Sequence, residues 1–240
     1  MHTTIVWLHG ANGRMGRAIQ DVAAEFPAAE LVPLQRDAPL PAQSPAVIID
    51  FSLPDGLLHA ARLATEHSVP LVSGTTGLQD IHRQALDRLA TQQAVLQANN
   101  FSLGLAATRK AATELAALLD WDCEIIETHH RLKRDAPSGT AVSLAESIRE
   151  ARNQAFEWSD RIADAGRSEV RTAGSLGVAS LRGGSVVGDH TVHFLGDGER
   201  IELTHRADDR RIFARGALLA ALKIVGKPAA RYQLHQVLWA

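Results

Sequence analysis

The chain has 240 residues of ordinary globular composition, 45% hydrophobic and 22% charged, with a formal net charge of −2. This length fits one large domain or two small ones, and a nucleic-acid partner is not expected because basic residues are not in excess. No apolar run approaches the ~18 residues of a membrane span, and the N-terminal stretch MHTTIVWLHG lacks a signal-peptide pattern. The single cysteine, Cys123, excludes an internal disulfide, and we expect a buried structural thiol in a cytoplasmic protein.

The N-terminal part of the chain alternates between short apolar runs and helical patterns. Strands are expected at TTIVWLH (3–9), ELVPLQ (30–35), AVIIDFS (46–52), VPLVSG (69–74) and AVLQA (94–98), and helices over 14–26, 54–66 and 78–90. This alternation predicts an α/β fold with a Rossmann-like, doubly wound parallel sheet. The crossover RDAPLPAQSP (36–45) carries three prolines, so we expect a loop there.

After residue 100 the pattern changes to that of a second, α+β domain. Helices are expected over 102–119, 139–152 and 211–225, the last followed by a short tail, and strands at CEIIETH (123–129), SLGVASLR (175–182), SVVGDHTVHFLG (185–196) and RIELTHRA (200–207). The breaks GGS (183–185) and GDGE (196–199) resemble hairpin turns, which predicts a mostly antiparallel sheet. Residues 153–175 give no clear signal.

A glycine-rich turn follows the first expected strand. GANGRMG places Gly10, Gly13 and Gly16 between that strand and a helix, where a pyrophosphate can approach the backbone at the helix N-terminus. The spacing is G-x-x-G-x-x-G, with Asn12 at the usual second glycine. The position favours nucleotide binding, and the alternative is a merely tight turn.

The end of the second expected strand bears on the choice of dinucleotide. Gln35 stands where a carboxylate would hold the ribose hydroxyls, and Arg36 follows it. Arg36 and Arg14 could pair with a 2′-phosphate, so we expect NADPH to be used at least as well as NADH. The alternative is that Arg36 is a solvated loop residue. Two further loops, SGTTG (73–77) and ANNFSLG (98–104), follow strand ends and should line the same edge of the sheet.

The stretch ETHHRLKRDAPSGTA (127–141) gathers positive charge ahead of a helix N-terminus. The strand would place His129 and His130 on opposite faces, with Lys133 on the following loop. If Ser138 is the N-cap, the backbone N–H groups of Gly139 and Thr140 point out of the helix end and suit a carboxylate. Histidine and lysine side chains can move protons.

The same stretch has two other interpretations. A solvated basic loop is the first. A zinc site is the second, but adjacent histidines offer poor tetrahedral geometry and no cysteine or carboxylate lies at metal-ligand spacing, so no metal is expected. His190 and His193, three apart on an expected strand, are interpreted as structural or surface residues.

These motifs, together with DFSLPDG (50–56), VVGDHTVHF, ERIELTHRADDR and FARGALLAA, resemble the 4-hydroxy-tetrahydrodipicolinate reductase (dihydrodipicolinate reductase) family over essentially the whole chain. The resemblance implies a dinucleotide-binding domain (1–100), a substrate-binding and oligomerisation domain (101–209) and a helix returning to the first domain (210–240). It also implies NAD(P)H-dependent reduction of a cyclic imine dicarboxylate in diaminopimelate and lysine biosynthesis, by a homotetramer.

The resemblance also implies roles for individual residues. His129 would be the acid/base and Lys133 the proton donor, while His130, Gly139 and Thr140 would hold the substrate. The cofactor would be contacted by Gly10, Ala11, Asn12, Gly13, Arg14, Met15, Gly74, Thr75, Thr76, Ala98, Asn99, Asn100 and Phe101. Two departures from the family are Gln35, where many relatives carry an acidic residue, and the short stretch between the second and third strands. The rival function is a dinucleotide-sensing binding protein that kept the fold without the catalysis.

Overall fold

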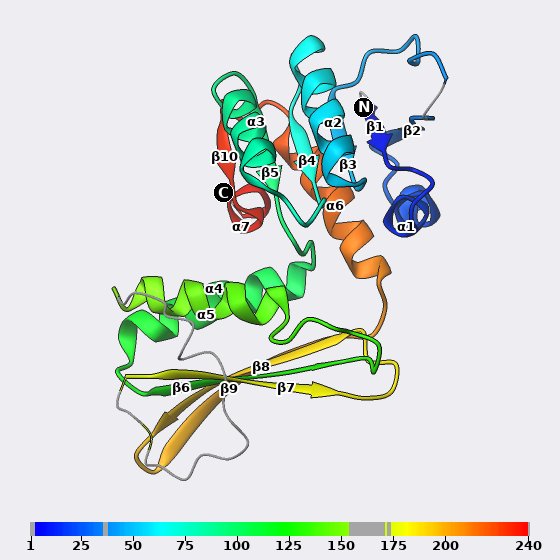
Figure 1. Cartoon of the computed structure of the whole chain (residues 1–240). Helices are drawn as coiled ribbons and strands as arrows, with labels where there is room; N and C mark the ends of the chain where they lie inside the picture. The colour runs from blue at the N-terminus through cyan, green and yellow to red at the C-terminus, as the bar shows by residue number, and fades with distance from the viewer. Residues whose placement is uncertain (1–2, 36–37, 154–170, 172–173, 240) are drawn as a thin grey trace. The chain divides into compact units, whose positions relative to one another are not determined.

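The computed structural model describes residues 3–35, 38–153, 171 and 174–239 (Figure 1). Arg36 and most of the stretch 153–175, which gave no clear signal, lie outside the described residues. The chain divides into two compact units, Met1–Leu103 with Arg211–Ala240, and Gly104–Arg210.

The first unit is a parallel sheet of six strands in the order β10-β5-β4-β3-β1-β2 (Figure 1). Its elements are β1 (Thr4–His9), α1 (Arg14–Val22), the 3₁₀ helix η1 (Ala23–Glu25), β2 (Ala29–Pro33), β3 (Val47–Asp50), α2 (Pro54–Glu66), β4 (Leu71–Ser73), α3 (Asp80–Ala90), β5 (Ala94–Gln97), α6 (Arg211–Ile224), β10 (Ala230–Tyr232) and α7 (Leu234–Leu238). The predicted Rossmann-like α/β architecture is therefore confirmed.

Along the central strands, successive side chains point to opposite faces of the sheet, so each face has its own core. On one face Trp7, Ile48 and Leu71 pack against Leu57 of α2 and Leu86 of α3. The alternate strand residues point to the opposite face, where α1 packs against α6 and α6 lies against β3 and β4. Strand order reverses between β1 and β3, which makes their carboxyl ends the switch point at which such sheets bind ligands.

The second unit is a four-stranded sheet in the order β7-β6-β8-β9, with two helices. Its elements are α4 (Leu103–Leu118), β6 (Asp122–His129), α5 (Gly139–Ala151), β7 (Leu176–Arg182), β8 (Gly188–Gly196) and β9 (Glu199–Ala207). The pairs β6–β8 and β8–β9 are antiparallel, whereas β6 and β7 run parallel. Apolar residues of α4 and α5 cover one face, where Cys123, Ile125 and Phe194 are buried.

Two details of the sequence prediction were wrong. The GGS break is not a hairpin, because β7 and β8 both pair with β6 and not with each other. The strand β6 takes the place between them, so the chain must pass from one side of β6 to the other. The expected tail after 225 also holds structure, because β10 adds to the edge of β5 and α7 follows it. The GDGE hairpin between β8 and β9 is confirmed.

Candidate functional site

The glycine turn lies at the end of β1, and two of its positions, Gly10 and Gly16, are packed too tightly for a side chain. Gly10 has φ +80°, and a Cβ there would lie 2.5 Å from the backbone oxygen of Phe51. A Cβ at Gly16 would lie 2.3 Å from the oxygen of Gly10, so α1 approaches the turn as only glycine allows. Gly13 is the N-cap of α1 and, among the described residues, no side chain caps this helix. The turn therefore exposes backbone at a helix N-terminus, as an anion site requires.

A buried carboxylate, Asp50, joins the ends of three strands beside this turn. Its Oδ1 accepts hydrogen bonds from Ser52 Oγ at 2.5 Å and pairs with Nδ1 of His9 at 2.9 Å. Its Oδ2 accepts from Ser73 Oγ at 2.8 Å and from Thr75 Oγ1 at 2.7 Å. Asp50 thereby holds β1, β3 and β4 in a fixed arrangement at the edge where the glycine turn lies. Sequence analysis did not assign Asp50 to the site.

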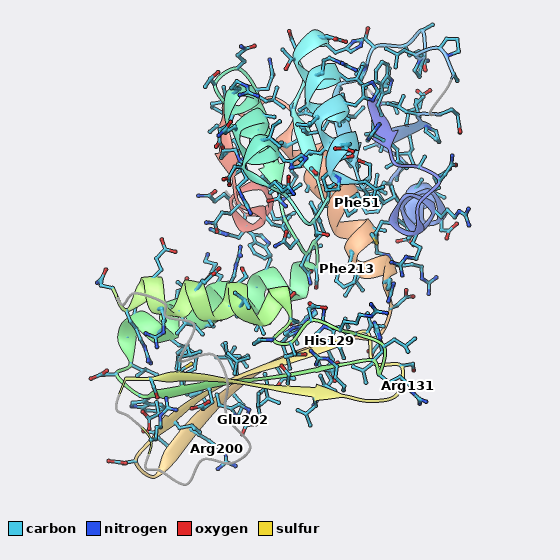
Figure 2. The ribbon with its side chains drawn as sticks, in the orientation of Figure 1. Phe51, His129, Arg131, Arg200, Glu202 and Phe213 are labelled. Carbon is cyan, nitrogen blue, oxygen red and sulfur yellow. The ribbon has the colours of Figure 1, made fainter. Side chains whose placement is uncertain are left out.

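The two other predicted loops reach the same edge of the sheet. The N–H of Gly74 donates to the backbone oxygen of Asp50 at 2.8 Å, and a Cβ at Gly74 would enter the ring of Phe51, which is labelled in Figure 2. Gln97 Nε2 donates to the backbone oxygen of Thr75 at 3.3 Å and to Asn99 Oδ1 at 3.2 Å. The strands β1, β4 and β5 are parallel, so their following loops, 10–15, 74–76 and 98–101, share one edge.

The part of this edge next to β2, where a ribose was predicted, is described less completely. Asn12 Nδ2 donates to Gln35 Oε1 at 3.4 Å, which links the glycine turn to the end of β2. Arg14, the first residue of α1, is exposed. Arg36 lies outside the described residues, so its predicted place beside a 2′-phosphate remains a prediction.

In the second unit, β6 ends in a buried acid–histidine pair. His129 (labelled in Figure 2) is 8% exposed, and its Nδ1 lies 2.5 Å from Oε2 of the fully buried Glu127. Arg182 of β7 binds the same carboxylate with both terminal nitrogens, at 2.9 and 2.7 Å. On the other side of the ring, a Cβ at Gly188 would lie 2.9 Å from His129 Nε2. A side chain at position 188 would therefore collide with this nitrogen, whereas glycine leaves space for the ring.

The N-terminus of α5 joins this cluster through Ser138. Ser138 is the N-cap, as predicted, because its Oγ accepts a hydrogen bond from the N–H of Ala141 at 3.1 Å. Its own N–H donates to Oε1 of Glu127 at 3.1 Å, and its Oγ lies 3.1 Å from Nε2 of His190. A Cβ added at Gly139 would meet nothing within 4 Å, so the approach to the first residue of the helix is open.

Lys133 lies on the loop between β6 and α5. Its Nζ binds Asp135 Oδ2 at 2.7 Å, and its backbone N–H donates to the oxygen of His130 at 3.1 Å. His129, the last residue of β6, is buried, and His130, which follows the strand, is half-buried. The structure thus brings the predicted residues of the basic stretch together in the second unit.

Burial and charge set the protonation of this cluster. Burial lowers the pKa of His129 below its usual value, even though the Glu127 carboxylate acts in the opposite direction. Burial would raise the pKa of Glu127, but hydrogen bonds from Arg182, Ser180 and His129 outweigh it and leave a net lowering. Burial, reinforced by the charge of His129, lowers the pKa of His190 to about 4. At neutral pH the cluster therefore holds an ionised glutamate and two neutral histidines.

The interpretation of His190 as a structural or surface residue was incomplete. His190 is buried, and its ring packs edge-on against His129 with centroids 5.2 Å apart. Sequence analysis also missed Glu127 and Arg182. One signal was present, because Glu127 and His129 are two residues apart on a strand and so share a face. His193 points to the other face, with Nδ1 3.7 Å from Glu202 Oε1.

Three other expectations concern the whole chain. Cys123 is buried and unbridged, and burial raises the pKa of its thiol to about 11, which fits a structural thiol. Within the described ranges, no group of three or more histidine, cysteine or acidic residues is arranged to hold a metal ion. Over the same residues, none of the helices has the length and apolar character needed to cross a membrane.

Comparison with known proteins gives the same family over both units. The family models "Dihydrodipicolinate reductase, N-terminus" and "Dihydrodipicolinate reductase, C-terminus" match residues 4–101 and 102–238. The 4-hydroxy-tetrahydrodipicolinate reductases of Zymomonas mobilis and Xanthomonas axonopodis pv. citri are each 43% identical to this chain, over 97% of it and 96% of their own length.

Solved structures agree with this match. A dipicolinate-bound dihydrodipicolinate reductase from Paenisporosarcina sp. TG-14 superposes with a TM-score of 0.78 at 25% identity, covering 96% of this chain and 97% of its own. The C. glutamicum DAP dehydrogenase shares the fold at 14% identity, with a TM-score of 0.56 over 100% of this chain and 94% of its own.

Proposed function

Because the chain belongs to the dihydrodipicolinate reductase family, we propose that it reduces 4-hydroxy-tetrahydrodipicolinate to tetrahydrodipicolinate with a nicotinamide dinucleotide, in diaminopimelate and lysine biosynthesis. The observation that carries the proposal is the buried Glu127–His129 pair, bonded through Ser138 to a helix N-terminus. This cluster joins a proton-transfer group to an anion-binding element, which reduction of an anionic imine requires.

The first unit would bind the dinucleotide, and its residues fit such a group. Gly13 is exposed at the N-cap of α1 and, among the described residues, no side chain forms a capping hydrogen bond there, so the N–H groups of the helix end can face a phosphate. The loops 74–76 and 98–101 would line the rest of the edge, and the bond from Thr75 to Asp50 holds the first of them. We propose that NADPH is used at least as well as NADH, because Gln35 places no negative charge near a 2′-phosphate and Arg14 and Arg36 can pair with it.

The second unit would bind the substrate and handle its protons. We assign one substrate carboxylate to the N-terminus of α5, where Gly139 and Thr140 present backbone N–H groups, with His130 nearby in sequence. The bound cofactor supplies the hydride. His129 would serve as acid/base, and Lys133 would donate the proton that completes the reduction, its ammonium group held by Asp135 at 2.7 Å until the substrate binds.

We also propose a homotetramer assembled through the sheets of the second unit. Helices α4 and α5 cover one face of this sheet. The other face carries Ile126, Leu181 and Leu195, each at least 37% exposed. A sheet face with exposed apolar side chains favours contact with another chain. Size-exclusion chromatography with light scattering tests this assembly, and a monomer at micromolar concentration would contradict it.

The proposed reaction is tested by a steady-state assay. Oxidation of NADPH, followed by the loss of its absorbance, should depend on 4-hydroxy-tetrahydrodipicolinate, and the matched reaction with NADH gives the cofactor preference. The rival function, a dinucleotide-sensing protein without catalysis, predicts that NADPH binds but is not oxidised when the cyclic imine is added. That result would refute the proposed function.

A further inference from the structure

The carboxylate of Glu127 is bonded by donors from three segments, β6, β7 and the N-terminus of α5. It is fully buried, and its oxygens bind His129 Nδ1, both terminal nitrogens of Arg182, and the N–H of Ser138. An ionised carboxylate can only accept hydrogen bonds. The ring nitrogen that faces it must therefore carry a proton, and Nε2 is left as the basic nitrogen of the neutral ring.

We propose that Glu127 is a positioning residue, which fixes the proton of neutral His129 on Nδ1 and binds the histidine and the N-terminus of α5 to one rigid carboxylate. This inference rests on the proposed function, because it assigns Glu127 a part in the same reaction. One carboxylate then sets two distances at once, since Oε2 holds the proton-transfer group and Oε1 holds Ser138 at the start of the proposed carboxylate site. Misplacement of either group by about 1 Å is costly to catalysis.

The surroundings of His129 are consistent with this role. The groups that face its ring are Glu127 on its own strand, Arg182 on β7, His190 on β8 and Lys133 on the loop after β6. His190 is neutral near pH 7 and packs edge-on against the ring. Arg182 and Lys133 disfavour a second proton on His129, and only Glu127 favours it. Replacing Glu127 or Arg182 should thus shift the titration of His129 in opposite directions.

The competing interpretation is a buried ion pair that only stabilises the sheet. Glu127→Gln and Arg182→Gln each break this pair, so both interpretations predict a loss of stability for both variants. The positioning role predicts in addition a change of tautomer at His129 in Glu127→Gln but not in Arg182→Gln. In Glu127→Gln an amide NH₂ can face Nδ1, which moves the ring proton to Nε2. In Arg182→Gln the carboxylate stays and loses its neutralising partner, so it attracts the second proton more strongly.

A matched control is available on the same strand. Glu124 of β6 also forms an ion pair with an arginine, Arg171, but its side chain alternates away from the face of Glu127 and His129. Glu124→Gln removes the β6 carboxylate that pairs with Arg171 and leaves the Glu127 cluster unchanged. It should leave the titration of His129 and the pH dependence of kcat unchanged.

The decisive measurement is ¹⁵N NMR of the imidazole rings over pH in the full-length protein, with His129 assigned by the loss of its signals in His129→Gln. We expect the neutral wild-type ring to carry its proton on Nδ1. In Glu127→Gln the proton should move to Nε2 and the pKa of His129 should fall, while in Arg182→Gln the pKa should rise. A wild-type ring protonated on Nε2, or shifts of the same sign in both variants, would overturn the proposal without any variant having to be active.

Kinetics provide a second, separate measurement. Glu127→Gln should lower kcat by about 10²-fold or more, as expected when a histidine is held in the wrong tautomer. The limb of the pH–rate profile that belongs to His129 should move to lower pH in Glu127→Gln and to higher pH in Arg182→Gln. A wild type without reductase activity would refute the proposed function, whereas the NMR titration would still support or overturn the placement of the proton.

Discussion

The buried histidine His190 should make the stability of the protein depend on pH in a measurable way. Its pKa is lowered from 6.5 to about 4, first by burial and then by the charge of His129. In the unfolded chain the ring binds a proton below about pH 6.5, whereas in the folded protein it stays neutral until about pH 4. The unfolded state therefore binds more protons between these values, and the free energy of unfolding falls as the pH falls through this window.

The size of the effect follows from the width of the window. One pH unit corresponds to about 1.4 kcal/mol, so His190 should remove about 3 kcal/mol of unfolding free energy between about pH 7 and about pH 4. The replacement His190→Gln removes this titration, and the amide nitrogen can still reach Ser138 Oγ. Other groups titrate in both proteins, so the comparison isolates position 190.

Urea denaturation at a series of pH values, followed by circular dichroism, measures this difference. The wild type should lose about 3 kcal/mol more than His190→Gln between about pH 7 and about pH 4. If the free energy of unfolding changes with pH in the same way in both proteins, the reasoning is refuted. His190 would then take up its proton in the folded state as readily as in the unfolded chain.

Four further predictions concern the proposed reaction. His129→Gln and Lys133→Ala should each lower kcat by about 10²–10⁴-fold with little change in the Kd of NADPH, and a near-native kcat in either would remove that residue's role. Gly139→Val should fold normally, since a Cβ there meets nothing within 4 Å, and should raise KM for the substrate more than for the cofactor; equal increases would contradict a carboxylate site. Gly188→Ala should lower kcat, because its Cβ would lie 2.9 Å from His129 Nε2 and displace the ring; unchanged kinetics would show that the ring yields freely. Arg36→Ala should weaken NADPH by about 10–150-fold, the equivalent of one charge-assisted hydrogen bond of about 1.5–3 kcal/mol, and leave NADH nearly unaffected; equal losses would refute the assigned pairing.

The sequence predicts the elements of this fold well where a pattern is local. The apolar run AVIIDFS predicted β3, which is buried throughout, and Ser138 followed by small residues predicted the start of α5. The strand β10 was missed because its three residues carry little apolar pattern and are strand only through pairing with β5. The pairing of β7 with β6 could not be predicted from a local pattern either, since a strand's neighbours depend on the whole sheet.

The same contrast between local patterns and contacts of distant segments holds for the candidate site. The motif predicted His129 and Lys133 as site residues, because they lie in one continuous stretch. It did not predict Asp50 as the hub of the first unit, because the groups bonded to this carboxylate come from β1, β4 and the loops after β3 and β4. It also missed that His190 contacts Ser138, 52 positions away in the chain. A hydrogen-bond network between distant segments leaves no mark in the spacing of residues.

The return of α6 and β10 to the first sheet has a consequence for synthesis on the ribosome. A nascent chain that ends before Arg211 has β1 to β5 but lacks α6, whose buried residues, among them Leu218 and Ile224, pack on β3, β4 and α1. The whole of Gly104–Arg210 must be translated in between, which takes on the order of ten seconds at about 5–20 residues per second. During that interval one apolar face of the sheet and the edge of β5 are uncovered. The nascent first half is therefore a natural client for chaperones that bind exposed apolar surface, while the inserted unit can complete its own fold as soon as β9 leaves the exit tunnel.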